Sequence, residues 1–266
     1  MTATPSVIVT AGYNYSPAAS ALIQLLPRDG VRVAGVLLVT PFAASRVAQV
    51  LRAKGLDGLI AAAGKAFGVQ RQPLTRRDPV EAFFEENELS TIRLDRLARQ
   101  NGVPFARVSS LDSNAATAFI DSVGAGGVLY CGGGIVRQPF LQHTRGMVLN
   151  AHAGPLPYVR GMNAAEWSVL FNLEPCTTIH FIDRGIDTGP TVTTIPVPIE
   201  AGEDVHRLRQ KTVVAGISGL RAAVRFLGTP PPPRSSDALD HKQVFTLSRA
   251  MSAYLEKKLT SNYSLP

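Results

Sequence analysis

The feature that most constrains the fold is an almost unbroken apolar run at residues 33–39. A strand covered on both faces, as in a parallel sheet, needs such a run, whereas a half-exposed strand alternates apolar and polar residues. A β-branched run at residues 6–10 precedes it, and the stretch 18–26 between them favours a helix, with Pro17 near its first turn. This order predicts an α/β fold with a Rossmann-like open sheet, mostly parallel, with helices on both faces.

The rest of the chain continues the pattern and predicts one domain over residues 1–228. We expect further strands at residues 104–108, 127–131, 147–150, 177–182 and 191–197, and helices at 115–122, 139–142, 164–171 and 203–227. A helical insert at about 43–100 is predicted to hold helices at 47–53, 59–67, 79–88 and 91–100. Residues 229–266 are predicted to form a proline-rich linker and a short tail with a strand at 244–246 and a helix at 248–258, packing on the core or on a partner chain.

Composition narrows the class of protein. With 45% hydrophobic and 18% charged residues the chain does not resemble a disordered one. No secretory signal or membrane-spanning run is recognised, and Cys131 and Cys176 form no metal pattern, so we expect a cytoplasmic protein without a metal. The net charge of +7 fits either a solvated basic surface or an anionic ligand. Nucleic acid is disfavoured because the basic residues are dispersed and only 7% of residues are aromatic.

Two segments rich in glycine and proline carry the polar side chains best suited to chemistry, and the first spans residues 150–157. Asn150 and His152 are two positions apart, so along an extended segment their side chains point to the same side. His152 can move a proton near neutral pH, and the amide of Asn150 can donate to an oxygen that becomes negative. The pair predicts a catalytic site for acyl transfer to an amine, the alternative being a buried histidine that only completes the core.

The second segment, residues 183–190, holds two carboxylates. Asp183 and Asp187 both stand near glycine, where aspartate commonly shapes a turn, and either can orient a histidine. Spacing alone does not choose between them. His180 lies on the preceding predicted strand, where its simplest role is that of a partly buried sheet residue, and Arg160 either binds an acidic group or solvates a loop.

Two turns near predicted strand ends are candidates for phosphate-binding loops. Gly132, Gly133 and Gly134 follow a late strand and lack the spacing of a dinucleotide-binding loop, so they favour either close approach to a flat ligand or a tight turn. The turn at residues 11–17 holds one glycine and reads as an ordinary strand–helix connection, although the amides at the start of the following helix can hold a phosphate.

The order and spacing of these motifs resemble the folate-dependent formyltransferases. The resemblance covers about residues 125–200 and includes a run at residues 133–141 that is similar to the family's cofactor-side loop. Within the superfamily the acceptor is glycinamide ribonucleotide, methionyl-tRNA or an amino sugar, and a deformylase also belongs to it. The matching residues are Asn150, His152, Leu156, Pro157, Arg160, Gly161, Thr178, His180, Asp183, Gly185, Asp187, Thr188, Gly189 and Pro190.

The resemblance implies roles for individual residues. It assigns Asn150, His152 and Asp187 as the catalytic residues and 10-formyltetrahydrofolate as the cosubstrate. The cofactor-binding residues that it implies are Gly132, Gly133, Gly134, Ile135, Val136, Pro139, Phe140, Ile182, Asp183, Gly185 and Ile186. Our candidates for substrate binding are Tyr13, Asn14, Tyr158, Arg160 and His180.

Departures from the family pattern bear on the acceptor. Gly154 stands where the family has serine, Pro155 where it has leucine, Cys176 where it has glycine, and Tyr158 comes one position early. The glycine-rich phosphate loop of the purine enzymes is missing at residues 11–16, and the tail is too short for the second domain of the tRNA enzymes. We therefore expect formyl transfer to the amine of a nucleotide-linked amino sugar.

Several alternatives stay open. Another small amine of secondary metabolism can be the acceptor, or water in a formyltetrahydrofolate deformylase, and a non-catalytic folate- or RNA-binding protein is an alternative of another class. The expected partner is a small, anionic amine, with no membrane, and a homodimer is considered.

Overall fold

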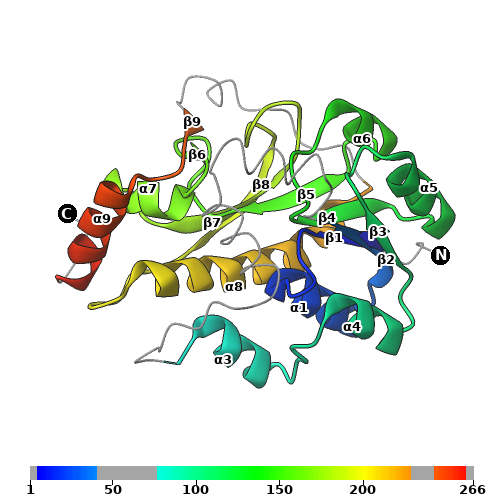
Figure 1. Ribbon diagram of the computed structural model, residues 1–266, viewed down its shortest axis with the longest axis horizontal. Coiled ribbons are helices and arrows are strands. Elements are labelled where there is room, and N and C mark those ends of the chain that lie inside the picture. The colour runs from blue at the N-terminus through cyan, green and yellow to red at the C-terminus, as the bar shows by residue number, and fades with distance from the viewer. Residues whose placement is uncertain (1–4, 41–76, 229–242, 262–266) are drawn as a thin grey trace. The chain divides into compact units, whose positions relative to one another are not determined.

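The computed structural model describes residues 5–40, 77–228 and 243–261 (Figure 1). The helices predicted at 47–53 and 59–67 and the proline run at 230–233 lie outside these residues. Contacts along the chain divide it into two units, the first formed by residues 1–76 and 87–145 and the second by residues 77–86 and 146–266.

The first unit is built on four parallel strands in the order β3-β2-β1-β4. Because β1 leads to β2 in one direction and β3 leads to β4 in the other, right-handed crossovers place their helices on opposite faces. Figure 1 shows α1 (Pro17–Leu25), which packs on β1, and α5 (Asn114–Val123), which packs on β2 and β3, on the two sides. The strands are β1 (Ser6–Ala11), β2 (Arg32–Val39), β3 (Phe105–Val108) and β4 (Gly127–Cys131).

Local sequence explains these elements. The apolar run in β2 is buried from Val33 to Val39, as a strand covered on both faces requires. Helix α1 begins after Ser16, whose hydroxyl accepts a hydrogen bond from Ala19 N, and a 3₁₀ turn, η1 (Leu26–Asp29), ends it at Gly30. The unit also contains α4 (Leu94–Gln100) and α6 (Gln138–His143).

The second unit is built on three antiparallel strands in the order β5-β7-β8. They are β5 (Val148–His152), β7 (Cys176–Phe181) and β8 (Thr191–Pro196), and α8 (Val205–Ala223) packs against all three. Gly219 permits this close approach, because a Cβ there would lie 2.6 Å from Ile179 Cγ1 and from Ile195 Cδ1. The helix predicted at 203–227 is thus an α-helix that ends in a 3₁₀ turn, η2 (Val224–Phe226).

Three further helices of the second unit pack on α8, and a small two-stranded sheet completes the unit. Helix α3 (Pro79–Glu86) packs on α8, and α9 (Arg249–Thr260) packs on both α7 (Ala164–Leu170) and α8. Leu255 and Leu259 of α9 are fully buried in a cluster that includes Leu208 of α8. The two-residue strand β6 (Arg160–Gly161) pairs in parallel with β9 (Gln243–Val244) of the tail, a pairing that the sequence did not predict.

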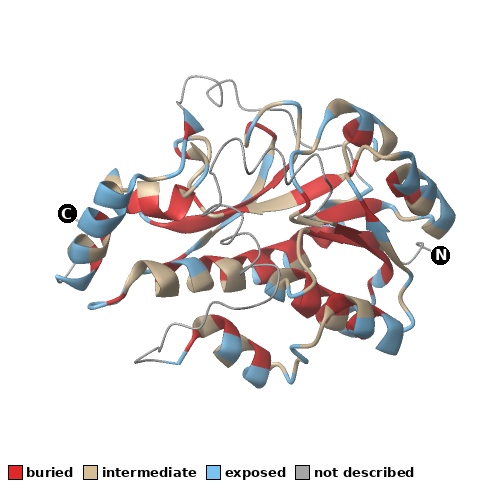
Figure 2. Ribbon diagram, viewed as in Figure 1, coloured by how far each residue is buried: buried red, intermediate tan, exposed pale blue. Residues whose placement is uncertain are grey.

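The predicted α/β class is confirmed, and among the described strand pairs of the seven main strands three are parallel and two antiparallel. Figure 2 shows the buried residues concentrated in the strands and the exposed ones on the outer sides of helices such as α5 and α9. Within the described ranges no helix is long and apolar enough to cross a membrane, and no cluster of metal-binding side chains occurs. Cys131 and Cys176 are free thiols. In the second unit the buried polar residues include His152, Thr178 and His180, which mark the site described next.

Candidate active site

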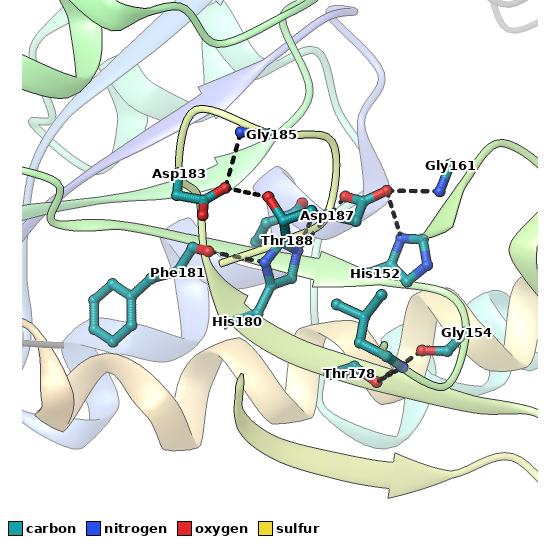
Figure 3. A network of polar contacts seen from close by, with 12 residues as sticks. His152, Gly154, Gly161, Thr178, His180, Phe181, Asp183, Gly185, Asp187 and Thr188 are labelled. Carbon is teal, nitrogen blue, oxygen red and sulfur yellow. Dashed lines mark hydrogen bonds and ion pairs between the residues drawn. The ribbon is translucent and has the colours of Figure 1, made fainter. Parts of the chain in front are cut away.

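Strand β5 delivers Asn150 and His152 to one cluster of polar side chains. The strand runs on to His152, two residues beyond its predicted end, so the two side chains share one side as expected. Opposite them on β7, Asn150 pairs with His180 and His152 pairs with Thr178. The two imidazole rings lie edge to face, with centroids 6.3 Å apart. Figure 3 shows both histidines beside Asp187.

The turn after β7 separates the roles of the two aspartates. Asp183 Oδ1 accepts hydrogen bonds from Gly185 N at 3.0 Å and from Thr188 Oγ1 at 2.7 Å, so this carboxylate shapes the turn. A Cβ on Gly185 would overlap Thr188, which explains the glycine. Asp187 has a left-handed backbone, with φ of 52°, and its carboxylate reaches the histidines (Figure 3).

The carboxylate of Asp187 has three neighbours. Its Oδ2 accepts a hydrogen bond from Gly161 N at 2.9 Å and lies 3.4 Å from His152 Nδ1. Its Oδ1 lies 3.7 Å from His180 Nε2. A backbone amide thus holds the carboxylate beside an imidazole, an arrangement that suits proton transfer.

Both ring nitrogens of His152 face acceptors. Nε2 lies 2.8 Å from the carbonyl oxygen of Val159, and a carbonyl can only accept, so Nε2 carries a proton. Nδ1 faces the carboxylate of Asp187. A ring protonated on both nitrogens satisfies both contacts, and its side chain is only 6% exposed.

The ring of His180 is held as a neutral tautomer. Nδ1 donates to Phe181 O at 2.9 Å, which leaves Nε2 as an acceptor for the side-chain amide of Asn150 at 3.0 Å. Burial lowers the pKa of His180 to about 4, although the negative charge of Asp187 opposes this shift. His180 therefore orients the amide of Asn150, so that Nδ2 points toward the ring.

Thr178 and Gly154 support the loop that follows β5. Thr178 Oγ1 donates to Gly154 O at 2.7 Å and accepts from Leu156 N at 3.3 Å. A Cβ on Gly154 would lie 2.8 Å from Ala164 Cβ and 3.3 Å from His152 Nε2. Glycine in place of the family's serine is therefore matched to the tight packing of this loop beside the imidazole.

In the first unit, the predicted cofactor-side residues form a tight turn after β4. The φ angles of Gly132, Gly133 and Gly134 are 111°, 135° and 95°, which favour glycine. A Cβ on Gly133 would lie 2.9 Å from Val39 Cγ2, so packing within the unit already requires this residue. Ile135 is 60% exposed. The other members of this set are the half-buried Val136, the exposed Pro139 and the buried Phe140.

The predicted substrate-binding residues lie in both units. In the first unit Tyr13 is half-buried, and the amide of Asn14 joins Asp95, with Nδ2 donating to Oδ2 at 3.3 Å. A hydrogen bond from Arg93 holds the pKa of Asp95 well below its usual range. In the second unit Tyr158 is exposed and Arg160 is half-buried in β6. His180 is 1% exposed, so it reaches Asn150 and Asp187 rather than the surface.

The cofactor-side residues of the second unit occupy the start of the aspartate turn. Ile182 is half-buried and Ile186 is 41% exposed. Sequence reasoning did not identify the backbone contacts from Val159 and Gly161, because amides and carbonyls leave no residue-type signal. It also missed the link from His180 to Asn150, which depends on the register between β5 and β7.

Comparisons with known proteins identify a family and several relatives of this chain. Residues 44–224 match the family model described as formyl transferase. Methionyl-tRNA formyltransferase of Clavibacter michiganensis is 32% identical over 147 residues, covering 52% of this chain and 48% of that protein. Phosphoribosylglycinamide formyltransferase of Mycobacterium tuberculosis H37Rv is 32% identical over 96 residues, covering 36% of this chain and 45% of that protein.

A solved structure supports the same fold. Glycinamide ribonucleotide transformylase 1 of Symbiobacterium toebii superposes with a TM-score of 0.57 at 19% identity, covering 85% of this chain and 88% of that one. The chain spans about half the length of the two curated relatives compared above. With residues 44–224 matching the family model, the chain belongs to the formyl transferase family.

Proposed function

We propose that this protein transfers the formyl group of 10-formyltetrahydrofolate to a primary amine. The observation that carries the proposal is the cluster of Asn150, His152, His180 and Asp187, in which the Asn150 amide is hydrogen-bonded to His180 and the Asp187 carboxylate lies 3.4 Å from His152 Nδ1. Family membership supports the same class of reaction. The bound cosubstrate would supply a formyl carbon attached to a nitrogen that leaves when the amine attacks.

Asn150 is the proposed direct donor to the oxygen that becomes negative. One N–H of its amide is directed to His180 Nε2, and the second is available to the substrate because a side-chain amide carries two protons. A donor of this kind contributes about 3 kcal/mol to the stability of the transition state. His180 then acts through Asn150 as a positioning residue.

His152 and Asp187 are the proposed acid–base pair. The Nδ1 proton of a doubly protonated His152 is shared with Asp187 over 3.4 Å, a long contact that leaves it available to a substrate oxygen. Asp187 stabilises the imidazolium. Directly or through a water molecule, it takes the proton of the attacking amine and passes it toward the leaving nitrogen. The amine must arrive neutral, because a protonated amine has no lone pair.

The chain's residues fit a flat, partly apolar cosubstrate. Ile135 in the first unit and Ile186 in the second each expose an apolar side chain within their own unit, and such a side chain can pack against a ring. The proposed contacts remain the residues that the resemblance implied, among which Phe140 is buried.

For the acceptor we propose an amino sugar linked to a nucleotide. The net charge of +7 favours an anionic substrate, and the exposed Tyr158 and half-buried Arg160 follow the catalytic strand closely in sequence. Two free thiols agree with a reducing, cytoplasmic setting. A second candidate is the deformylase reaction, since the same residues can activate water.

A screen of nucleotide-linked amino sugars and small amines with 10-formyltetrahydrofolate tests the proposal. We expect one amine to gain the mass of a formyl group, and the Asp187→Asn variant to slow this strongly. Release of formate without any amine would instead identify a deformylase. If neither product forms while folate binds, the protein is a binding module and the proposal fails.

A further inference from the structure

The short segment at residues 159–161 touches both charged side chains of the site through its backbone. Gly161 N donates to Asp187 Oδ2 at 2.9 Å, and Val159 O accepts from His152 Nε2 at 2.8 Å. We call residues 159–161 the bracket. Because the bracket holds one atom of each partner, its position sets the distance between the imidazole and the carboxylate.

The C-terminal strand β9 pairs with the bracket. Gly161 pairs with Val244 in the parallel ladder, and Met162 N donates to Val244 O at 3.1 Å. Gly161 has φ of 105°, and a Cβ on it would overlap the Val244 carbonyl. The close approach of β9 therefore requires glycine at the residue whose N–H reaches Asp187.

Three further contacts anchor β9 and the residues that follow it to the residues around the bracket. Trp167 Nε1 donates to Phe245 O at 2.7 Å, and Leu247 N donates to Asn163 Oδ1 at 3.4 Å. Val244 is 9% exposed and packs in a cluster with Val159 of the bracket. The tail strand thus binds the bracket through both its backbone and a buried side chain.

A second chain of polar contacts ties this anchor to α8. Asn163 Nδ2 donates to Glu166 Oε1 at 2.7 Å, and the buried carboxylate of Glu166 is ion-paired with Arg209 of α8. Asn163, which accepts the hydrogen bond from Leu247 N, is therefore itself held in place. By contrast, Leu255 and Leu259 of α9 pack in a different apolar cluster, with Val169 and Leu208.

We propose that β9 is a positioning strand for the active site. By holding the bracket it keeps Gly161 N–H on Asp187 and the Val159 carbonyl on His152, so loosening β9 slows catalysis although no catalytic residue is removed. The effect on rate rests on the formyl transfer proposed above, whereas the effect on the Gly161 hydrogen bond does not. Small displacements of reacting groups lower rates steeply.

Val244→Ala and Trp167→Phe test the proposal kinetically. Val244→Ala removes packing against Val159, whereas Trp167→Phe removes the hydrogen bond to Phe245 O and shortens the ring that packs on the same cluster. We expect kcat to fall about tenfold in Val244→Ala and less in Trp167→Phe, with the KM of both substrates within about twofold. Val244→Ile, which keeps the packing, should retain the wild-type kcat.

Leu259→Ala is the matched control, because it truncates a fully buried side chain of the same tail away from the bracket. It should lower the unfolding midpoint at least as much as Val244→Ala does, and it should leave kcat within about twofold of wild type. An equal loss of kcat in this control would reduce the effect to general destabilisation and overturn the proposal.

The amide resonance of Gly161 supplies a readout that needs no substrate. A proton donated to a carboxylate resonates downfield, so we expect Val244→Ala to shift it upfield and speed its exchange with solvent, while Leu259→Ala does neither. An unchanged Gly161 amide resonance in Val244→Ala would contradict the positioning role of β9, whatever value of kcat is measured. If the resonance responds but wild-type protein transfers no formyl group, the positioning strand stands and the proposed function falls.

Discussion

Two turns of this molecule bend the backbone in unusual ways, and they differ in what they present. The glycine turn, Gly132–Gly134, has three positive φ angles, and close packing inside the first unit accounts for glycine at Gly132 and Gly133. The aspartate turn, residues 183–189, has a positive φ at Asp187, a residue with a side chain. Aspartate adopts the left-handed region more readily than most residues, and here that conformation places a carboxylate beside two buried histidines.

The comparison teaches how to weigh glycine-rich motifs. In the glycine turn Thr10 Oγ1 donates to Gly132 O at 2.8 Å, so a neighbouring strand fixes the backbone. In the aspartate turn Asp183 fixes the backbone and frees Asp187 to face His152. The first turn is therefore explained largely by packing, whereas the second positions ionisable groups against one another.

Asp187→Asn is the change with the largest expected effect. The amide keeps the shape of the side chain but loses the charge beside His152, so both stabilisation of the imidazolium and proton transfer are lost. We expect kcat of formyl transfer to fall about 10²- to 10⁴-fold, with the fold retained. Single-turnover kinetics and circular dichroism measure the two quantities. Near-wild-type turnover would show that the aspartate turn is structural like the glycine turn.

Asp183→Ala should have a smaller effect, because it acts through the turn. Loss of the bonds to Gly185 N and Thr188 Oγ1 lets Asp187 move from its left-handed conformation. We expect kcat to fall about tenfold to a hundredfold, since a misplaced catalytic group slows the reaction without abolishing it. Thr188→Val, which removes one of the two bonds, should fall between this variant and wild type in the same assay.

The sequence predicted most elements because their signals are local. The apolar run of β2, the serine before α1 and the apolar periodicity of α8 each lie within one element. The same locality explains why Asn150 and His152 could be placed on one side of an extended segment.

What the sequence did not predict depends on contacts between distant segments. The pairing of β6 with β9 joins residues about 80 positions apart, and two-residue strands carry no periodic signal. The choice between Asp183 and Asp187 required the path of the turn, and only the family resemblance pointed to Asp187 beforehand. The link from His180 to Asn150 required the strand register, because a slip of one residue would turn His180 to the other face.

Gly133→Ala tests the packing explanation of the glycine turn. A Cβ would lie 2.9 Å from Val39 Cγ2 on a backbone with φ of 135°, so the variant combines a steric clash with backbone strain. We expect the free energy of unfolding to fall by about 2 kcal/mol, measured by denaturant titration. A rise in the KM for the folate cosubstrate, with little loss of stability, would contradict the packing explanation and favour a ligand-contacting turn.

The pH dependence of the free energy of unfolding tests whether the ring of His180, beside the aspartate turn, stays neutral in the folded protein. Burial lowers the pKa of His180 to about 4 from an ordinary value near 6.5, so between these values the unfolded chain binds more protons than the folded one. The contribution of this ring to the free energy of unfolding therefore keeps its full value above pH 6.5. It falls as the pH drops from 6.5 toward 4, because the unfolded chain gains a proton that the buried ring does not. From pH 7 to pH 5 the loss amounts to about 2 kcal/mol.

His180→Gln isolates this contribution, because the other histidines are common to both proteins. Glutamine can still accept a hydrogen bond from Asn150 but does not titrate. Denaturant titrations at both pH values should therefore give the variant a smaller fall in unfolding free energy than wild type. Equal falls in the two proteins would mean that protonation of His180 is tolerated in the folded state. A neutral ring would then not be required to orient Asn150. The argument that packing determines the glycine turn, whereas buried polar groups determine the surroundings of the aspartate turn, would lose its strongest support.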